Sequence, residues 1–359
     1  MKINRIFLIK AKFLTWLLFF KYIFMRILII FISIIVIGCQ SNKRNDQYFD
    51  YTGRKDKLSG GVQTIKINTP SGEFNVWTKR VGNNPNKKVL LLHGGPGFDH
   101  QYFQAVDSYF PNESIEYYYY DQLGSNNSDN PKDESLWTIE RFVDEVEQVR
   151  QALGLNKDNF IILGHSWGGI LGIEYAIKHQ ANLKALIISN MVPSIPDYIR
   201  YANDVLAPQL DPEVLKKIRA FEEADDYTNP EYFALVEEHY YPKHALRMPL
   251  EEWPDPVTRS QSKLNFDIYL KMQGPSEFGV VGDALLKDWN RKEDLKNLKI
   301  PVLTIGGEYD TMDPKQMEWM STEVQNGTYL HCPNGSHWSM YDDQEVYFKG
   351  VTDFIKTLP

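Results

Sequence analysis

The sequence predicts an α/β fold in which a mostly parallel sheet carries helices on both faces and is interrupted by a helical insert. Short apolar runs alternate with segments of helical periodicity over residues 61–192 and again over 290–359. Between them, residues 193–289 lack buried-strand runs and are rich in Tyr, Trp, Pro and acidic residues. We therefore expect a two-part core, 61–192 and 290–359, with residues 193–289 as a helical lid.

The core elements follow in order from their patterns. Alternating residues over 62–81 predict an antiparallel hairpin that turns at Pro70-Ser71-Gly72. Residues 87–92, with their apolar run Val89–Leu92, and the tyrosine-rich segment 115–120 predict strands, and the apolar spacing over 134–153 predicts a helix. The remaining elements expected are strands at 160–163, 183–189, 300–305 and 328–330, and helices at 170–177, 314–324 and 344–356. Strands that alternate with helices indicate a parallel sheet covered on both faces.

The charge balance argues against one class of partner. The chain has 359 residues, 24% of them charged, and a net charge of −8. Its first 38 residues carry six of the 39 Lys and Arg and no acid, so the rest holds 33 basic against 47 acidic residues. Such a surface repels phosphates, and no nucleic-acid partner is expected.

The N-terminal residues predict a lipoprotein. Residues 27–37 form an apolar run that is short for a membrane-spanning helix and typical of a signal-peptide core. The following Val36-Ile37-Gly38-Cys39 resembles the bacterial lipobox, in which the cysteine is lipidated. We expect a signal peptide over 1–38, lipid on Cys39 and a tether over 39–60. The protein would then lie in the cell envelope, anchored to the membrane surface outside the cytoplasm.

An alternative at the same end is an uncleaved membrane anchor, because Phe13–Phe20 adds a second apolar patch. Met25 is an alternative start of translation, since Met25-Arg26 before the apolar run makes an ordinary signal-peptide beginning. Cys39 and Cys332 are the two cysteines of the sequence, so no disulfide framework is expected.

A nucleophile is predicted at Ser166. It lies in Gly164-His165-Ser166-Trp167-Gly168-Gly169, between a predicted strand and a predicted helix. In that context a Gly-x-Ser-x-Gly motif holds the serine on a sharp turn, with its hydroxyl at a helix N-terminus.

A serine hydroxyl needs a base, which is usually a histidine held by a carboxylate. Asp310 and His337 follow later strands, in the order Ser, Asp, His that such folds use. Asp313 is a rival acid, but Asp313-Pro314 is typical of a helix N-cap and first residue. His331 is a rival base that is expected in or beside a strand.

Two backbone amides are expected to bind the oxyanion. The loop His93-Gly94-Gly95-Pro96-Gly97 follows a central strand, and we assign the amides of Gly95 and Trp167. A phosphate-binding loop is disfavoured because no Gly-Lys-Ser/Thr follows, and His-Glu-x-x-His is absent. We therefore expect neither a metal nor a cofactor.

Together with Asp121-Gln122-Leu123-Gly124, Gly306-Gly307-Glu308-Tyr309-Asp310 and Gly335-Ser336-His337, these motifs resemble the proline iminopeptidase family. Its members are serine aminopeptidases of the α/β-hydrolase fold. The resemblance covers about residues 60–359, and lid motifs at 253–254 and 272–278 are similar to the tricorn-interacting branch. One departure is Ser125-Asn126-Asn127-Ser128, where the family usually has a further glycine. Asn tolerates left-handed backbone angles, so we expect the loop to persist.

The resemblance implies release of N-terminal proline, or of small apolar residues, from short peptides through an acyl-enzyme. It also implies that lid carboxylates bind the free amino group: Glu277, with Glu238 or Glu237 as its partner. Trp253, Tyr240 and Phe278 are candidates to line a proline-shaped pocket. The alternative is an esterase or amidase that uses the same residues on non-peptide acyl substrates. The oligomeric state is left open.

Overall fold

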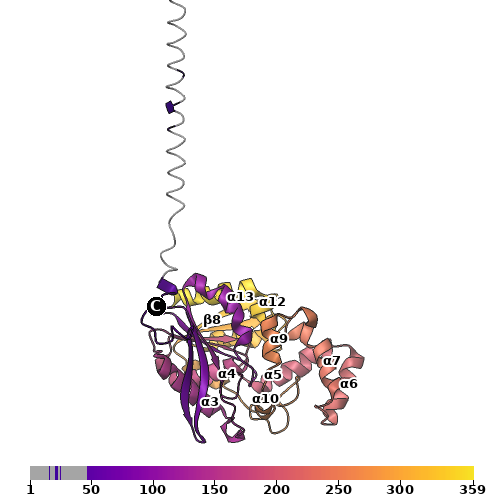
Figure 1. The fold of residues 1–359 in the computed structure, drawn as a ribbon. Helices are drawn as coiled ribbons and strands as arrows, with labels where there is room; N and C mark the ends of the chain where they lie inside the picture. The colour runs from indigo at the N-terminus through magenta and orange to yellow at the C-terminus, as the bar shows by residue number, and fades with distance from the viewer. Residues whose placement is uncertain (1–15, 17–20, 23–24, 26–46) are drawn as a thin grey trace, which may run out of the picture. The chain divides into compact units, whose positions relative to one another are not determined.

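The computed structural model describes residues 16, 21–22, 25 and 47–359, and Asp50–Pro359 form one compact unit. Its centre is a sheet of eight strands in the order β1-β2-β4-β3-β5-β6-β7-β8. Figure 1 shows this sheet with helices around it. β1 pairs antiparallel with β2 and β2 with β4, and the other neighbouring pairs are parallel. The strands are β1 (Val62–Thr69), β2 (Gly72–Val81), β3 (Lys88–Leu92), β4 (Glu116–Asp121), β5 (Phe160–His165), β6 (Ala185–Ser189), β7 (Pro301–Gly307) and β8 (Asn326–Cys332).

Both faces of the sheet are buried. In β3, Leu90 and Leu92 pack into one apolar cluster, whereas Val89 and Leu91 pack into a second cluster on the other face. The first cluster includes side chains of α3 (Ile139–Leu153), α4 (Trp167–His179) and α11 (Pro314–Glu323), and the second includes those of α13 (Gln344–Thr357). Successive residues of a strand point to opposite faces, so a continuous apolar run is what a sheet covered on both sides requires. The predicted fold class is confirmed.

The helix predicted over 134–153 begins later than expected. Residues Glu134–Leu136 form a 3-10 turn, and α3 starts at Ile139. The Thr138 side chain accepts a hydrogen bond from the Arg141 amide (3.3 Å), which satisfies a free amide of the first helical turn and fixes the start there. The apolar periodicity extended past this cap because Leu136 is itself buried.

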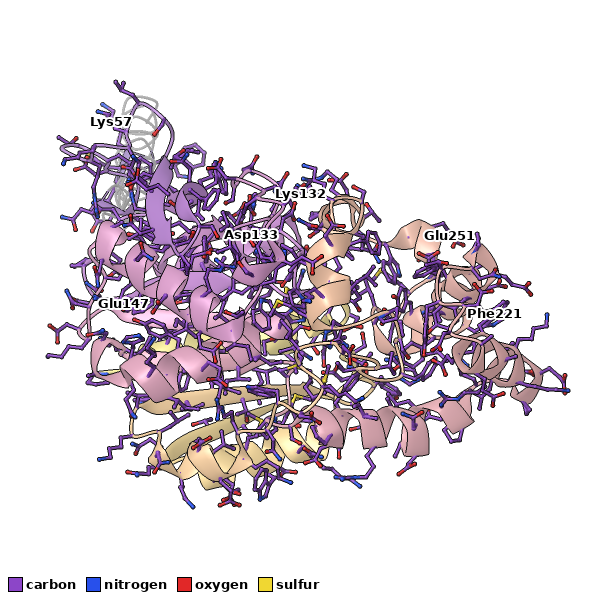
Figure 2. The ribbon with its side chains drawn as sticks, turned by 90° about the horizontal axis from the view of Figure 1, so that it is seen from below. Lys57, Lys132, Asp133, Glu147, Phe221 and Glu251 are labelled. Carbon is purple, nitrogen blue, oxygen red and sulfur yellow. The ribbon has the colours of Figure 1, made fainter. Side chains whose placement is uncertain are left out.

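Residues between β6 and β7 form helices. These are α5 (Ile195–Tyr201), α6 (Pro212–Glu223), α7 (Pro230–His239), α8 (Tyr241–His244), α9 (Asp255–Gln261) and α10 (Phe266–Met272). They include a small apolar core of their own, in which Ile218, Tyr232 and Phe278 are buried. Figure 2 shows Phe221 and Glu251 of this insert at the opposite end of the unit from Glu147 of α3. We call residues 193–289 the lid.

The loop after β4 retains its shape without the family's glycine. Asn126 adopts φ +33°, in the left-handed region that asparagine tolerates. The neighbouring Asn127 donates from its amide (3.2 Å) and side chain (2.9 Å) to one oxygen of Asp121. These hydrogen bonds to Asp121 hold the loop in its observed conformation.

Cys39 and the apolar run before it lie outside the described residues. Among the residues that the structure describes, no helix combines the length and apolar character needed to span a bilayer.

Candidate active site

Ser166 lies on a strained turn between β5 and α4. Its backbone angles are φ 56° and ψ −124°, which a side-chain-bearing residue adopts only when its surroundings enforce them. The Ser166 amide donates to Ser189 O (3.0 Å), and its carbonyl accepts from the Gly169 amide (2.7 Å). A Cβ at Gly164 would collide with the Gly168 carbonyl, and one at Gly168 with the Leu92 carbonyl. The two glycines therefore allow the close backbone packing that holds Ser166 in place.

Asp310 and His337 meet at the same edge of the sheet. Asp310 follows β7, is fully buried, and its Oδ1 lies 2.8 Å from His337 Nδ1. Asp313 instead accepts the Lys315 amide (2.9 Å) as the N-cap of α11. His331 lies in β8, 3.5 Å from Glu308. The structure thus brings Asp310 to His337 and leaves the two rivals elsewhere.

Asn190 supports the second oxygen of Asp310, a contact that sequence reasoning missed. Its Nδ2 donates to Asp310 Oδ2 (2.8 Å) and also lies 3.0 Å from Ser336 O. The Met312 amide donates to Asp310 Oδ1 (3.0 Å). Asn190 directly follows β6 and has φ +54°, so its position past a strand end was the signal that could have identified it.

Two backbone amides of residues that line the cavity with Ser166 have no hydrogen-bond acceptor among the described residues. The Gly94 amide is occupied, because it donates to the Tyr102 hydroxyl (2.6 Å). In the described part of the chain, the amides of Gly95 and Trp167 donate to no other residue. Trp167 is the first residue of α4, where an amide has no partner within the helix. Gly95 and Trp167 both line the cavity that contains Ser166.

Tyr102 and His165 link three loops of the site. His165 Nε2 lies 2.7 Å from the His337 carbonyl oxygen, which can only accept, so Nε2 carries the ring hydrogen. His165 Nδ1 therefore accepts from the Tyr102 hydroxyl (3.1 Å), whose oxygen in turn accepts from the Gly94 amide. Burial lowers the pKa of His165 well below its usual value, and the nearby His337 lowers it further. The neutral ring is the form that this direction of hydrogen bonding requires. Sequence reasoning assigned no role to Tyr102.

A cavity of about 380 Å³ is lined both by residues that follow the core strands and by residues of the lid. Ser166 and His337 line it from the core, and Tyr198, Tyr241, Tyr269 and Glu277 line it from the lid. The further residues of its wall include Phe98, Met191, Ile195, Leu264, Leu286 and Trp338. The wall is therefore largely apolar and aromatic, with few charged groups, as is usual for a small-molecule site.

Glu277 is the less exposed of the two acids that line this cavity. The Tyr269 hydroxyl donates to its Oε1 (3.0 Å), and the Tyr198 hydroxyl donates to its backbone carbonyl (2.9 Å). Burial raises the pKa of the Glu277 carboxyl, while the hydroxyls of Tyr269 and Tyr241 and the charge of His337 lower it in part. Glu277 keeps some accessible surface because it faces the cavity, although protein surrounds it on its other sides. Glu277 and His337 line the same cavity.

The other lid residues expected at the site divide between the cavity and its surroundings. Glu237 lines the cavity and is exposed, whereas the Glu238 side chain is 75% exposed beside His239 and lies outside the lining. Trp253 is buried behind the wall, where its ring meets that of Trp338 at a centroid distance of 5.6 Å. Tyr240 and Phe278 belong to the separate core of the lid. The tyrosines that contact Glu277 replace them as the aromatic wall.

No group of three or more His, Cys, Asp or Glu within the described residues is arranged to hold a metal ion. Cys332 is free and buried.

The chain resembles known proteins over most of its length. The sequence profile of the alpha/beta hydrolase fold matches residues 87–344. A protein of Chitinophaga pinensis named proline iminopeptidase is 54% identical over 81% of this chain and 97% of its own. A protein of the same name from Flavobacterium johnsoniae is 55% identical over 81% of this chain and 97% of its own. The crystal structure of a proline iminopeptidase from Mycobacterium smegmatis superposes with a TM-score of 0.72, at 29% identity, over 82% and 98% of the two chains.

Proposed function

This chain belongs to the proline iminopeptidase family of α/β hydrolases, and we propose that it releases N-terminal proline, or a small apolar residue, from short peptides. The observation that carries the proposal is the buried carboxylate of Glu277 in the same cavity as Ser166. An ionised carboxylate is costly to bury without a cation. The free ammonium of a peptide N-terminus supplies that cation within one residue of the bond to be cut.

The catalytic roles follow from the hydrogen bonds around His337. Its Nδ1 donates to Asp310, which leaves Nε2 of the neutral ring free to accept the Ser166 hydroxyl proton. Ser166 Oγ then attacks the carbonyl carbon of the first residue. The amides of Gly95 and Trp167 bind the resulting oxyanion, and each such donor contributes about 3 kcal/mol to lowering the barrier.

Collapse of the tetrahedral intermediate completes acylation. The C–N bond breaks, and His337 gives its proton to the departing amine of the shortened peptide. Water attacks the acyl-enzyme ester while His337 takes one of its protons. Proline then leaves as the free acid, and the proton returns to Ser166 Oγ.

Glu277 decides between this activity and the esterase alternative. Glu237 is exposed, so water screens its charge, and Glu277 is the stronger candidate for the ammonium. A panel of aminoacyl 4-nitroanilides, with N-acetylprolyl 4-nitroanilide and a small neutral ester beside them, tests the proposal on the purified soluble protein. Prolyl anilide should be turned over best and its acetylated form very poorly. Good turnover of the acetylated substrate would favour the esterase.

We also propose that the mature protein is a lipoprotein of the cell envelope, anchored through Cys39. The support is the apolar run over 27–37 and the lipobox-like Val36-Ile37-Gly38-Cys39. Mass spectrometry of the mature N-terminus tests it: a lipid-modified Cys39 is expected, and Cys39→Ser should block the modification. An unmodified N-terminus upstream of residue 38 would favour the uncleaved anchor.

A further inference from the structure

Three large apolar side chains are exposed at the cavity that contains Ser166. Phe233 is 38% exposed, Phe266 53% and Leu270 44%, and all three line this cavity. Single exposed apolar residues are ordinary on a protein surface. Three that gather at one cavity are not, since such patches usually mark a binding surface. We call Phe233, Phe266 and Leu270 the rim.

The rim residues come from two lid helices, α7 and α10. Phe266 and Leu270 are four residues apart on α10, and Phe233 is four residues before Glu237 on α7. Residues with this spacing lie on one side of a helix. Both helices therefore present one side to the cavity at its solvent end, because exposed residues that also line a cavity mark its opening.

The direction of the substrate follows from the fixed ends of the site. With the ammonium at Glu277 and the first carbonyl at Ser166, every later residue of the peptide must run toward the opening. The first side chain on that route is that of the second residue, next to the bond that is cut.

We propose that the rim is the binding site for the side chain of the peptide's second residue, and that it selects apolar and aromatic side chains there. This inference rests on the proposed aminopeptidase function. An apolar side chain covers exposed carbon surface on the rim, which stabilises the complex in proportion to the area removed from water. Glu237 lines the same cavity one turn after Phe233 on α7, so its carboxylate, close to the rim, should repel an acidic second residue.

The test compares three peptides that differ at one position: Pro-Leu-Gly-amide, Pro-Gly-Gly-amide and Pro-Glu-Gly-amide. Release of free proline is followed by mass spectrometry, and kcat/KM is obtained for each. The wild type should prefer Leu to Gly at the second position by roughly tenfold, the usual scale of discrimination by apolar contacts. The Glu peptide should be the poorest of the three.

Two variants test whether the rim residues cause the preference for Leu over Gly at the second position. Leu270→Ser and Phe266→Ser should each lower the Leu-over-Gly ratio several-fold. Leu285→Ser is the matched control, because Leu285 is 45% exposed but does not line the cavity, and its ratio should equal that of the wild type.

The possible outcomes distinguish a failure of the rim proposal from a failure of the proposed aminopeptidase function. Equal release of proline from the Leu and Gly peptides by the wild type would overturn the rim proposal and leave the aminopeptidase intact. The rim proposal would also be overturned if the rim variants lost activity on the Leu and Gly peptides equally, because the Leu-over-Gly ratio would then be unchanged. Failure to release proline from any peptide would instead contradict the proposed function.

Discussion

The core wall and the lid wall of the cavity hold their charges in opposite ways. The carboxylate of Asp310 accepts from His337 and the Met312 amide on one oxygen and from Asn190 on the other. Glu277 accepts from tyrosine hydroxyls and, among the described residues, has no salt bridge. The acid of the core is fully paired in the free protein, whereas the acid of the lid is left without a cation.

Under the proposed function, this difference separates the catalytic groups from the group that binds the substrate. The core charge is fixed before substrate arrives, so no reorganisation is needed during reaction. The lid charge is costly until a cation enters, and its raised pKa reflects that cost. In the free protein the Glu277 carboxylate therefore lacks a cationic partner, and a substrate ammonium would provide one.

The largest effect is expected at the core. Ser166→Ala should lower kcat by about 10⁴-fold or more, and His337→Ala nearly as much, because the three residues act as one unit and their losses do not add. Circular dichroism should show both variants folded. A Ser166→Ala enzyme that retained more than a few per cent of wild-type rate, with contamination excluded, would remove Ser166 as the nucleophile.

A smaller loss is expected where the core loops are linked. Tyr102→Phe removes the hydroxyl between the Gly94 amide and His165, so the oxyanion loop loses its tie to the turn at Ser166. We expect kcat to fall by about ten- to a hundredfold while KM changes little, since the loss falls on the transition state. Tyr109→Phe is the control. It removes a tyrosine hydroxyl that contacts Gln344 and Glu345, and Tyr109 does not line the cavity, so kcat and KM should both stay unchanged. A rise in KM at constant kcat would show that Tyr102 shapes binding instead.

The smallest effect concerns stability and its dependence on pH. The native pKa of Glu277 is raised above the unfolded value, so the native chain binds more protons between the two values, and stability falls as pH rises through that range. Glu277→Gln lacks this slope and should be more stable at neutral pH by about 0.5–2 kcal/mol, as is common when a strained site is relieved. Urea unfolding at several pH values measures it, with the exposed Glu238→Gln as control. A Glu277→Gln protein that is less stable at neutral pH would mean that the charge is already compensated.

The candidate triad of the core wall could be predicted from the sequence, whereas its supporting residues Asn190 and Tyr102 could not. Each catalytic residue follows a strand, and its neighbours have fixed backbone tasks, such as the glycines that pack against carbonyls around Ser166. Such backbone requirements restrict the residue type at neighbouring positions, so they are visible as short sequence motifs. The order Ser166, Asp310, His337 could therefore be predicted together with the sheet.

The lid wall could be predicted only in part, because its contacts join residues from different helices. Glu277 followed from a motif resemblance, but the tyrosines around it come from α5, α8 and α10, and nothing in their spacing marks them. Trp253 was expected to line the pocket, yet it packs behind Trp338. A tryptophan fits either place, and tertiary packing decides between them.

The most direct test is kcat/KM on prolyl 4-nitroanilide and on a small neutral ester, for the wild type, Glu277→Gln and the control Glu238→Gln. If Glu277 holds the ammonium, Glu277→Gln should lose at least about a hundredfold on the prolyl substrate, the scale of a broken buried pair. The neutral ester brings no cation, so its turnover should change little, and Glu238→Gln should match the wild type on both. Equal losses on the two substrates would contradict the assignment of Glu277 and leave the lid without a charge-based role.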